Sequence, residues 1–271
     1  MQPAVCLAHG LPDAARVQAG QALFNSPALL GGQAAKAGLN CASCHVNGRG
    51  NAHFLMTGVS DRPGTADVTS SFFSAARSNG RFDPIAIPDL ALPGKVARDP
   101  AARALEPVIR MLIVEEFGGQ EPTPAMLDAL AAYVRAIRIC PGDMGRPVRR
   151  GPQDQLVIIQ AALAGAIDMA QRGDAQAARA LIAAARHQLG LVSERYSGAA
   201  LTRERAQLLR AARDLQAVAA KADDGQEFAR TVQAWHANFR TGLATRLLRK
   251  ERQSLYNPAN LGFVAPQRDS R

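Results

Sequence analysis

The chain has 271 residues, of which 47% are hydrophobic and 20% are charged, as in globular proteins that bury a sizeable core. No apolar run approaches the roughly 18 residues of a membrane span, so we expect no transmembrane segment. The formal net charge of +9 divides into +2 for residues 1–149 and +7 for residues 150–271. Because the arginines of the second half are scattered, a solvated helical surface is favoured over a nucleic-acid site.

The first predicted helix spans residues 13–24, with Asp13 as its N-cap. Val17, Gly20 and Phe24 share one side of it at helical spacing. Gly20 has no side chain and would allow a second helix to approach closely. Prolines and paired glycines then predict a loop over residues 25–40.

The strongest chemical pattern in the chain follows this loop, in the residues Cys41-Ala42-Ser43-Cys44-His45. Two cysteines three residues apart, with a histidine directly after the second, are typical of covalent haem c attachment. Both thiols lie on one face of a helical turn and can reach the two vinyl groups of one haem, and His45 can then ligate the iron. A redox Cys-x-x-Cys would need a thioredoxin-like context, and a zinc site a second ligand pair; the sequence shows neither.

Residues 46–103 are rich in Gly, Pro, Ser, Asn and Asp, and we predict irregular loops there. So long a stretch without secondary structure is unusual in a compact domain. A haem, which takes the place of a conventional core, would account for it.

Two helices are predicted to close the first half of the chain, over residues 105–117 and 124–138. Tyr133 of the second is expected to meet Gly20 and Phe24 where the first and last helices cross.

A Pro- and Gly-rich linker over residues 141–152 predicts two domains, residues 1–145 and 150–271. The second is predicted as an up-and-down four-helix-bundle-like domain, so that the whole protein is all-α. Its amphipathic helices are expected at residues 153–171, 174–189, 202–222 and 226–252.

Cys6 and Cys140 flank the helices of the haem domain. Haem attachment of this kind takes place after export, where disulfides form, so we hypothesise a Cys6–Cys140 disulfide; two free cysteines are the alternative. Such a crosslink would stabilise the fold by about 4–5 kcal/mol. Residues 1–12 lack the features of a signal peptide, which favours a trimmed chain or a misplaced start codon over a cytoplasmic protein. The expected location is the periplasm.

The order of Gly20-x-x-x-Phe24, Cys41–His45 and Leu127-x-x-Leu130-x-x-Tyr133-Val134 resembles a cytochrome c domain. More closely, residues 16–138 are similar to one haem domain of the bacterial di-haem cytochrome c peroxidase and MauG-like family. The stretch from Thr69 to Phe82 and the helix pair 105–117 and 124–138 add to this similarity. The resemblance implies a cytochrome c-like haem domain.

The chain departs from that family in two ways. It has one Cys-x-x-Cys-His motif, where the family uses two haems, and its Ser78-Asn79-Gly80-Arg81-Phe82-Asp83 run lacks the histidine that the family often has there. Acid–base assistance for O–O cleavage is therefore missing from the expected place. This argues against peroxidase chemistry unless a partner supplies a second haem.

The family resemblance implies Met111 as the second axial ligand, since the family places a methionine in the helix before the last one. Met56 and His53 are rivals, and an open sixth position is the remaining alternative. A methionine on an amphipathic helix is also a common core residue.

We therefore expect a mono-haem c-type cytochrome with one covalent haem held by Cys41, Cys44, His45 and Met111. Electron transfer with an acidic redox partner is the favoured function, with no catalytic side chain and no nucleic-acid partner. The alternatives are a peroxidase-like or dehydrogenase enzyme, or a subunit of one, with an open iron position, and a ligand-binding module built on the second domain.

Overall fold

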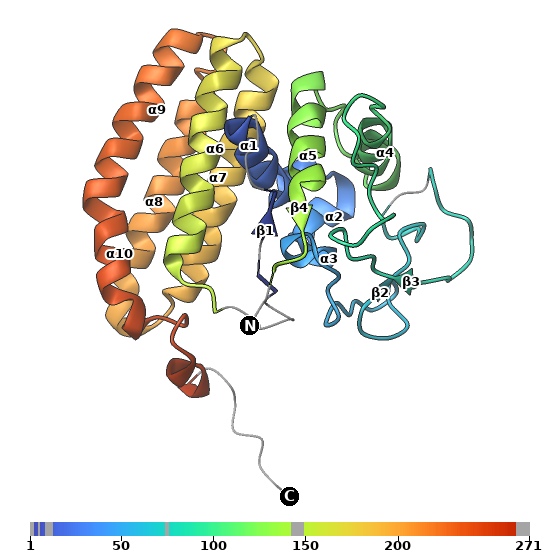
Figure 1. Ribbon diagram of the computed structural model, residues 1–271. Coiled ribbons are helices and arrows are strands. Elements are labelled where there is room, and N and C mark those ends of the chain that lie inside the picture. Colours follow the sequence, from blue (N-terminus) through green and yellow to red (C-terminus); the bar gives the residue numbers. More distant parts are fainter. Residues whose placement is uncertain (1–2, 5, 9–12, 74–75, 142–148, 264–271) are drawn as a thin grey trace, which may run out of the picture.

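A computed structural model describes residues 3–4, 6–8, 13–73, 76–141 and 149–263 of the chain. Nearly all of its regular structure is helical, as the sequence predicts (Figure 1). The helices are α1 (Ala14–Phe24), α2 (Gly32–Lys36), α3 (Cys41–Cys44), α4 (Leu105–Met111), α5 (Pro124–Ala136), α6 (Pro152–Gln171), α7 (Ala175–Arg195), α8 (Thr202–Ala219), α9 (Gly225–Phe239) and α10 (Thr245–Lys250). Two-residue strands form two antiparallel pairs, β1 (Cys6–Leu7) with β4 (Ile137–Arg138) and β2 (Thr65–Ala66) with β3 (Ile85–Ala86).

The first half of the chain is organised by the crossing of α1 and α5. The crossing is so close that a Cβ atom on Gly20 would lie 1.9 Å from the carbonyl oxygen of Ala129. The rings of Phe24 and Tyr133 meet edge to face beside it, with centroids 5.2 Å apart. The predicted contact of these residues is confirmed, and Asp13 caps α1 by accepting a hydrogen bond from the Arg16 amide.

The second half consists of four long helical segments that lie side by side (Figure 1). Helix α6 contacts α7 and α9, and α8 contacts α7 and α9, so the four segments surround a shared apolar interior. The expected break after residue 189 is wrong. Helix α7 continues to Arg195 because Leu189 and Val192 extend its buried face and Gly190 costs a helix only about 1 kcal/mol relative to alanine.

The last predicted helix is interrupted. A π-helical turn, Arg240–Ala244, separates α9 from α10. Nothing in the apolar periodicity of this segment indicates the extra residue of a π-turn, because the buried residues continue across it with Leu243 and Leu247.

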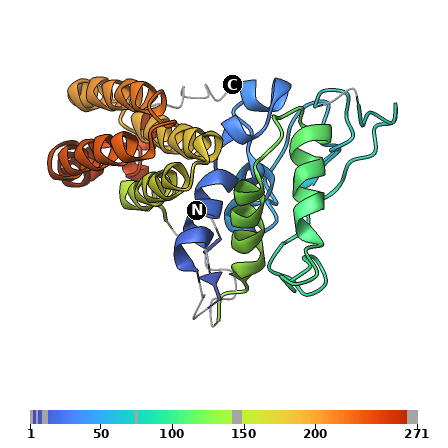
Figure 2. The same ribbon diagram turned by 90° about the horizontal axis from the view of Figure 1, so that it is seen from above.

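Helix α1 lies between the two halves and contacts both α5 and α6 (Figure 2). A Cβ atom on Gly165 of α6 would lie 2.9 Å from the Cβ atom of Ala19, so the backbones of α1 and α6 are also in close contact. Buried apolar residues from both halves form one continuous core. Of the predicted linker, residues 142–148 lie outside the described part of the chain, and the division into two domains stays a prediction.

The predicted disulfide is confirmed: Cys6 and Cys140 are joined, with Cα atoms 5.2 Å apart. Strands β1 and β4 pair beside this bond, with Cys6 opposite Arg138. The disulfide and the strand pair thus connect the segment before α1 to the segment after α5.

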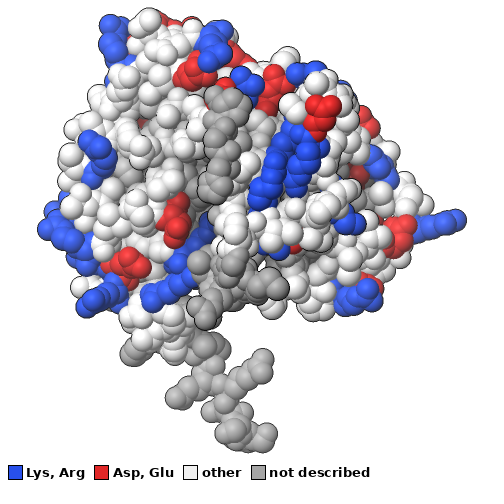
Figure 3. All heavy atoms as spheres, in the orientation of Figure 1, with Lys and Arg blue, Asp and Glu red and all other residues white. Residues whose placement is uncertain are grey.

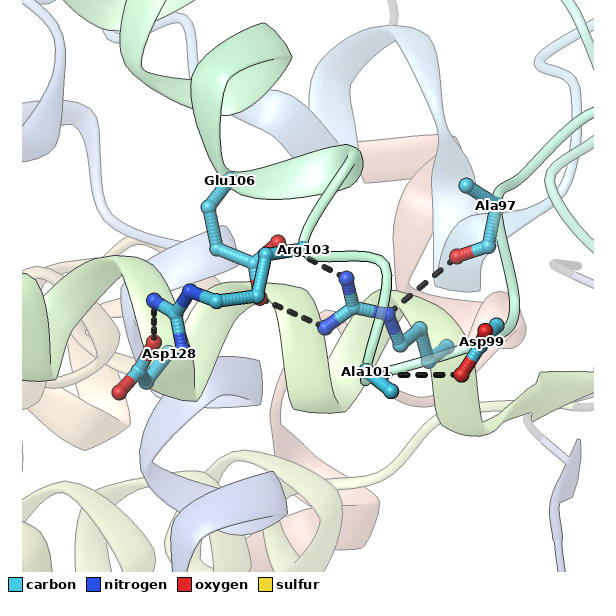
Figure 4. A network of polar contacts seen from close by, with 7 residues as sticks. Ala97, Asp99, Ala101, Arg103, Glu106 and Asp128 are labelled. Carbon is cyan, nitrogen blue, oxygen red and sulfur yellow. Dashed lines mark hydrogen bonds and ion pairs between the residues drawn. The ribbon is translucent and has the colours of Figure 1, made fainter.

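Apart from β2, β3 and a 3-10 turn at Val46–Gly48, the described residues between 46 and 104 form loops, as predicted for residues 46–103. Polar contacts fasten these loops to the helices. The guanidinium of Arg135 binds both oxygens of the buried Glu106 carboxylate at 2.8 Å, and its Nε donates to the carbonyl of Ala97. Arg103 pairs with Asp128 of α5 in the same network (Figure 4). Since a buried bidentate pair is lost only at a high cost, this network fixes the end of the loop region against α4 and α5. Within the described residues no helix is both long and apolar enough to span a bilayer.

Candidate functional site

The turn that carries the cysteines is held by hydrogen bonds at both ends. The amide of Asn40 donates to Ser43 Oγ at 3.0 Å, and the amide of His45 donates to the Cys41 carbonyl at 2.9 Å. Asn51 Nδ2 donates to the carbonyl of Ser43 at 2.8 Å. A four-residue helix is not stable by itself, so these contacts are what hold the Cys-x-x-Cys turn in place.

Cys41 and Cys44 are both free thiols and are half-buried at the edge of the core. Burial raises the pKa of each thiol to about 12, and the neighbouring Cys44 adds to the rise at Cys41. At these pKa values both thiols are protonated at neutral pH, and the structure has no disulfide between them. Thioether formation consumes two reduced thiols at this spacing, which is the state found here.

His45 is oriented by a residue far away in the sequence. Its Nδ1 lies 3.1 Å from the carbonyl oxygen of Pro88. Because a carbonyl only accepts, Nδ1 carries the hydrogen, and the lone pair of Nε2 is left for a metal. Burial lowers the pKa of His45, which favours the neutral imidazole that ligates iron.

The Pro88 carbonyl is itself held in place. The amide of Leu90 donates to the Gly48 carbonyl at 3.0 Å, and Arg49 Nε lies 2.7 Å from Asp89 Oδ2. Arg98 donates to the Leu90 carbonyl and to three carbonyls at the end of α5 and the start of β4, those of Val134, Arg135 and Ile137. The carbonyl that orients the His45 ring is therefore connected to the helical core, an arrangement that could hold the ring of a metal ligand in place.

Several large apolar side chains in the loop region, residues 46–104, are exposed to solvent. Leu55, Phe82 and Ile85 are 62%, 58% and 66% exposed. Phe72 and Leu92 of the loops and Val108 of α4 are also exposed, although the loop region holds buried residues such as Phe54 and Val59. Exposed apolar side chains are available for contact with a ligand, and a flat apolar macrocycle fits a region that supplies such side chains but little core.

Met111 is half-buried at the end of α4, where the helix changes into a π-helical turn, Leu112–Glu116. The Met111 sulfur accepts a hydrogen bond from Nη1 of Arg77. Nε of the same guanidinium lies 3.2 Å from Oε2 of Glu116, whose residue is 1% exposed. Neither Glu116 oxygen accepts a hydrogen bond from the residues that the structure describes, and burial raises the pKa of this carboxyl.

The two other candidates for the second axial ligand, Met56 and His53, have different surroundings. Met56 is half-buried in the loop region, packed against the core. His53 is exposed, and its ring makes no hydrogen bond with the described residues. Within the run from Ser78 to Asp83, the Asp83 carboxylate accepts a hydrogen bond from Asn79. It accepts a second one from Thr69, which lies outside the run.

The sequence analysis located the thiols and the histidine but missed the residues that support them. These are the Pro88 carbonyl, Arg98 and the Arg77–Glu116 pair. A proline in a loop 43 residues after the histidine gives no pattern that would identify its carbonyl as a partner. In the described part of the chain no group of three or more His, Cys, Asp and Glu side chains forms a metal site. Comparisons of the chain with protein-family models, with curated proteins and with solved structures gave no match.

Proposed function

We propose that the chain is a mono-haem c-type cytochrome that transfers electrons to or from a redox partner in the periplasm. Cys41 and Cys44 would hold one haem c by two thioethers, and His45 would be the proximal ligand. When bound, haem c supplies a one-electron Fe(III)/Fe(II) couple. Residues 1–145 would then be a cytochrome c-like domain and residues 150–271 a four-helix-bundle-like domain.

One observation carries this proposal: the contact between His45 Nδ1 and the Pro88 carbonyl, next to two reduced cysteines. The thioredoxin alternative has no use for a histidine held in one tautomer with Nε2 free. A histidine that ligates a metal needs a hydrogen-bond acceptor at its other ring nitrogen, because the acceptor fixes the ring and increases the basicity of the ligating nitrogen. The uncovered apolar side chains of the loop region support a large apolar occupant on the same half of the chain.

Met111 is the proposed sixth ligand, and its place beside a π-turn supports this assignment, since π-turns often occur at functional sites. Ligation would require the sulfur to exchange its contact with Arg77 for the iron. A His/Met pair gives a closed site with a raised potential, suited to electron transfer rather than to substrate binding.

An acidic redox partner is favoured by the net charge of +7 on residues 150–271. On the face shown in Figure 3, basic side chains are spread over the surface with acidic side chains among them. A net positive charge that is spread in this way steers an acidic protein during encounter without the compact basic patch that nucleic-acid binding uses.

The Arg77–Glu116 pair supports a second candidate, a peroxidase-like or dehydrogenase enzyme or subunit with an open iron position. If Met111 does not ligate, Arg77 and a buried carboxyl with a raised pKa, that of Glu116, would be available near Met111. Such groups assist proton transfer in enzymes.

Absorption spectra of the protein, matured in a host with a working haem-attachment system, separate the candidates. We expect a weak ferric band at about 695 nm, typical of Met–Fe ligation, and no fast binding of carbon monoxide to the reduced protein. Met111→Leu should abolish the band, and Met56→Leu is the matched control that should retain it. A band that persists in Met111→Leu would exclude this ligand, and fast carbon monoxide binding to the unmodified protein would favour the enzyme.

A further inference from the structure

A cavity of about 490 Å³ lies between the α3 turn and the second half of the chain. Ala42 and Ser43 form one wall, and α6, α7 and the segment 255–261 supply the others. Cys41, Cys44 and His45 do not line it, so it is separate from the proposed haem site. We call it the arginine pocket, after Arg149, Arg150 and Arg195 in its walls.

The charge of the arginine pocket is not compensated. Among the described residues that line it, three are arginines and none is an aspartate or a glutamate. None of the three forms an ion pair with a carboxylate in the described part of the chain: Arg149 Nε donates to the Tyr256 carbonyl at 3.0 Å, and Arg150 donates to Asn47 Oδ1. The carboxylate that acts on Arg150 is Asp154, which accepts from the Gly151 amide at 2.7 Å. A cavity with three such guanidinium groups attracts anions.

The pocket also contains a neutral polar side chain. Gln188 of α7 is 2% exposed and lines the pocket. Its amide can donate to a ligand oxygen and accept from a ligand hydroxyl.

The rest of the lining is apolar. Leu191, Leu255, Pro258 and Leu261 line the same space. Ligand pockets combine an apolar lining with a few polar groups that orient the ligand, and a cavity of this size accepts a small organic molecule. Inorganic phosphate alone would leave these apolar groups without contacts.

We propose that the arginine pocket is a binding site for a small organic anion that carries a carboxylate or a phosphate group. The guanidinium groups of Arg149, Arg150 and Arg195 bind the anionic oxygens, Gln188 donates to one of them, and the apolar part of the anion packs on the leucines. The proposal does not depend on the haem, because none of the side chains that bind the anion belongs to the Cys-x-x-Cys-His turn.

Titration calorimetry of the full chain at low ionic strength tests the site, with pyrophosphate, citrate and octanoate as probes. We expect at least one probe to bind, and the tightest one shows whether phosphate, several carboxylates or an apolar carboxylate is preferred. Arg195→Gln should weaken binding by about tenfold or more, as for a charge-assisted hydrogen bond. Arg230→Gln, which removes an exposed arginine on α9, is the control and should change the affinity less than about twofold.

Gln188→Leu provides a second test, because it separates a ligand contact from a packing role. Replacement of the amide by an apolar group of similar size should weaken probe binding several-fold. Three results would each overturn the proposal. The first is an unchanged probe affinity in Gln188→Leu, and the second is an equal loss of affinity in Arg195→Gln and Arg230→Gln. The third is that no probe binds with a dissociation constant below about 1 mM.

Discussion

Gly20→Ala and Gly190→Ala are the same change in two helices, and the structure predicts opposite effects. A Cβ atom at Gly20 would lie 1.9 Å from the Ala129 carbonyl oxygen and 2.9 Å from the Tyr133 Cβ atom. At Gly190 it would meet nothing within 4 Å. Both variants gain about 1 kcal/mol of helix propensity. At Gly20 the gain is exceeded by overpacking, which costs about 3 kcal/mol when the obstacle is backbone that cannot rotate away.

We therefore expect Gly20→Ala to lower the free energy of unfolding by about 2 kcal/mol and Gly190→Ala to raise it by about 1 kcal/mol. Urea unfolding followed by far-ultraviolet circular dichroism measures both, provided that the m-values agree with that of the parent protein. The reasoning would be refuted if both variants moved the midpoint in the same direction by similar amounts, because α1 and α5 would then not be in contact at Gly20.

Three further predictions concern stability. Cys6→Ser with Cys140→Ser should cost about 5 kcal/mol in urea unfolding without reductant, because the closed loop spans 134 residues; a loss below about 1 kcal/mol would contradict the crosslink. Glu116→Gln should raise the melting temperature relative to the parent, and the gain should grow with pH. Burial raises the pKa of Glu116 in the folded protein above the ordinary glutamate value. The folded state is therefore most stable where Glu116 is protonated, and it loses this stability as the pH rises through the raised pKa. An equal gain at about pH 4 and pH 8 would refute this assignment. Arg135→Ala should cost about 3–5 kcal/mol because Glu106 is left buried and unpaired, and Glu106→Ala in the same chain should restore part of it; no recovery in the double variant would contradict the pairing.

Local patterns were sufficient for much of the fold. The helix cap at Asp13, the core-facing stripe of α5 and the glycine at the α1–α5 crossing are each encoded within a few neighbouring residues. The Cys6–Cys140 pairing followed from the position of two cysteines at the ends of one predicted unit. These features depend on residue type, on spacing and on position relative to the predicted helices, all of which a single sequence contains.

The remainder depends on contacts between distant segments. Gly190 did not end α7, because the apolar face continued beyond it, and the π-turn between α9 and α10 left no trace in the spacing of apolar residues. The Pro88 carbonyl supports His45 through a backbone group, which residue identity does not reveal. The arginine pocket joins α3 to residues more than 100 positions later, so no local pattern contains it.

Covalent attachment of one haem is the central claim, and extraction of the matured, denatured protein with acidified acetone tests it most directly. The account predicts that the pigment stays with the polypeptide, and that replacing both Cys41 and Cys44 with alanine releases or prevents it. A colourless protein from a host with working maturation machinery, or pigment that passes into the acetone, would contradict the account.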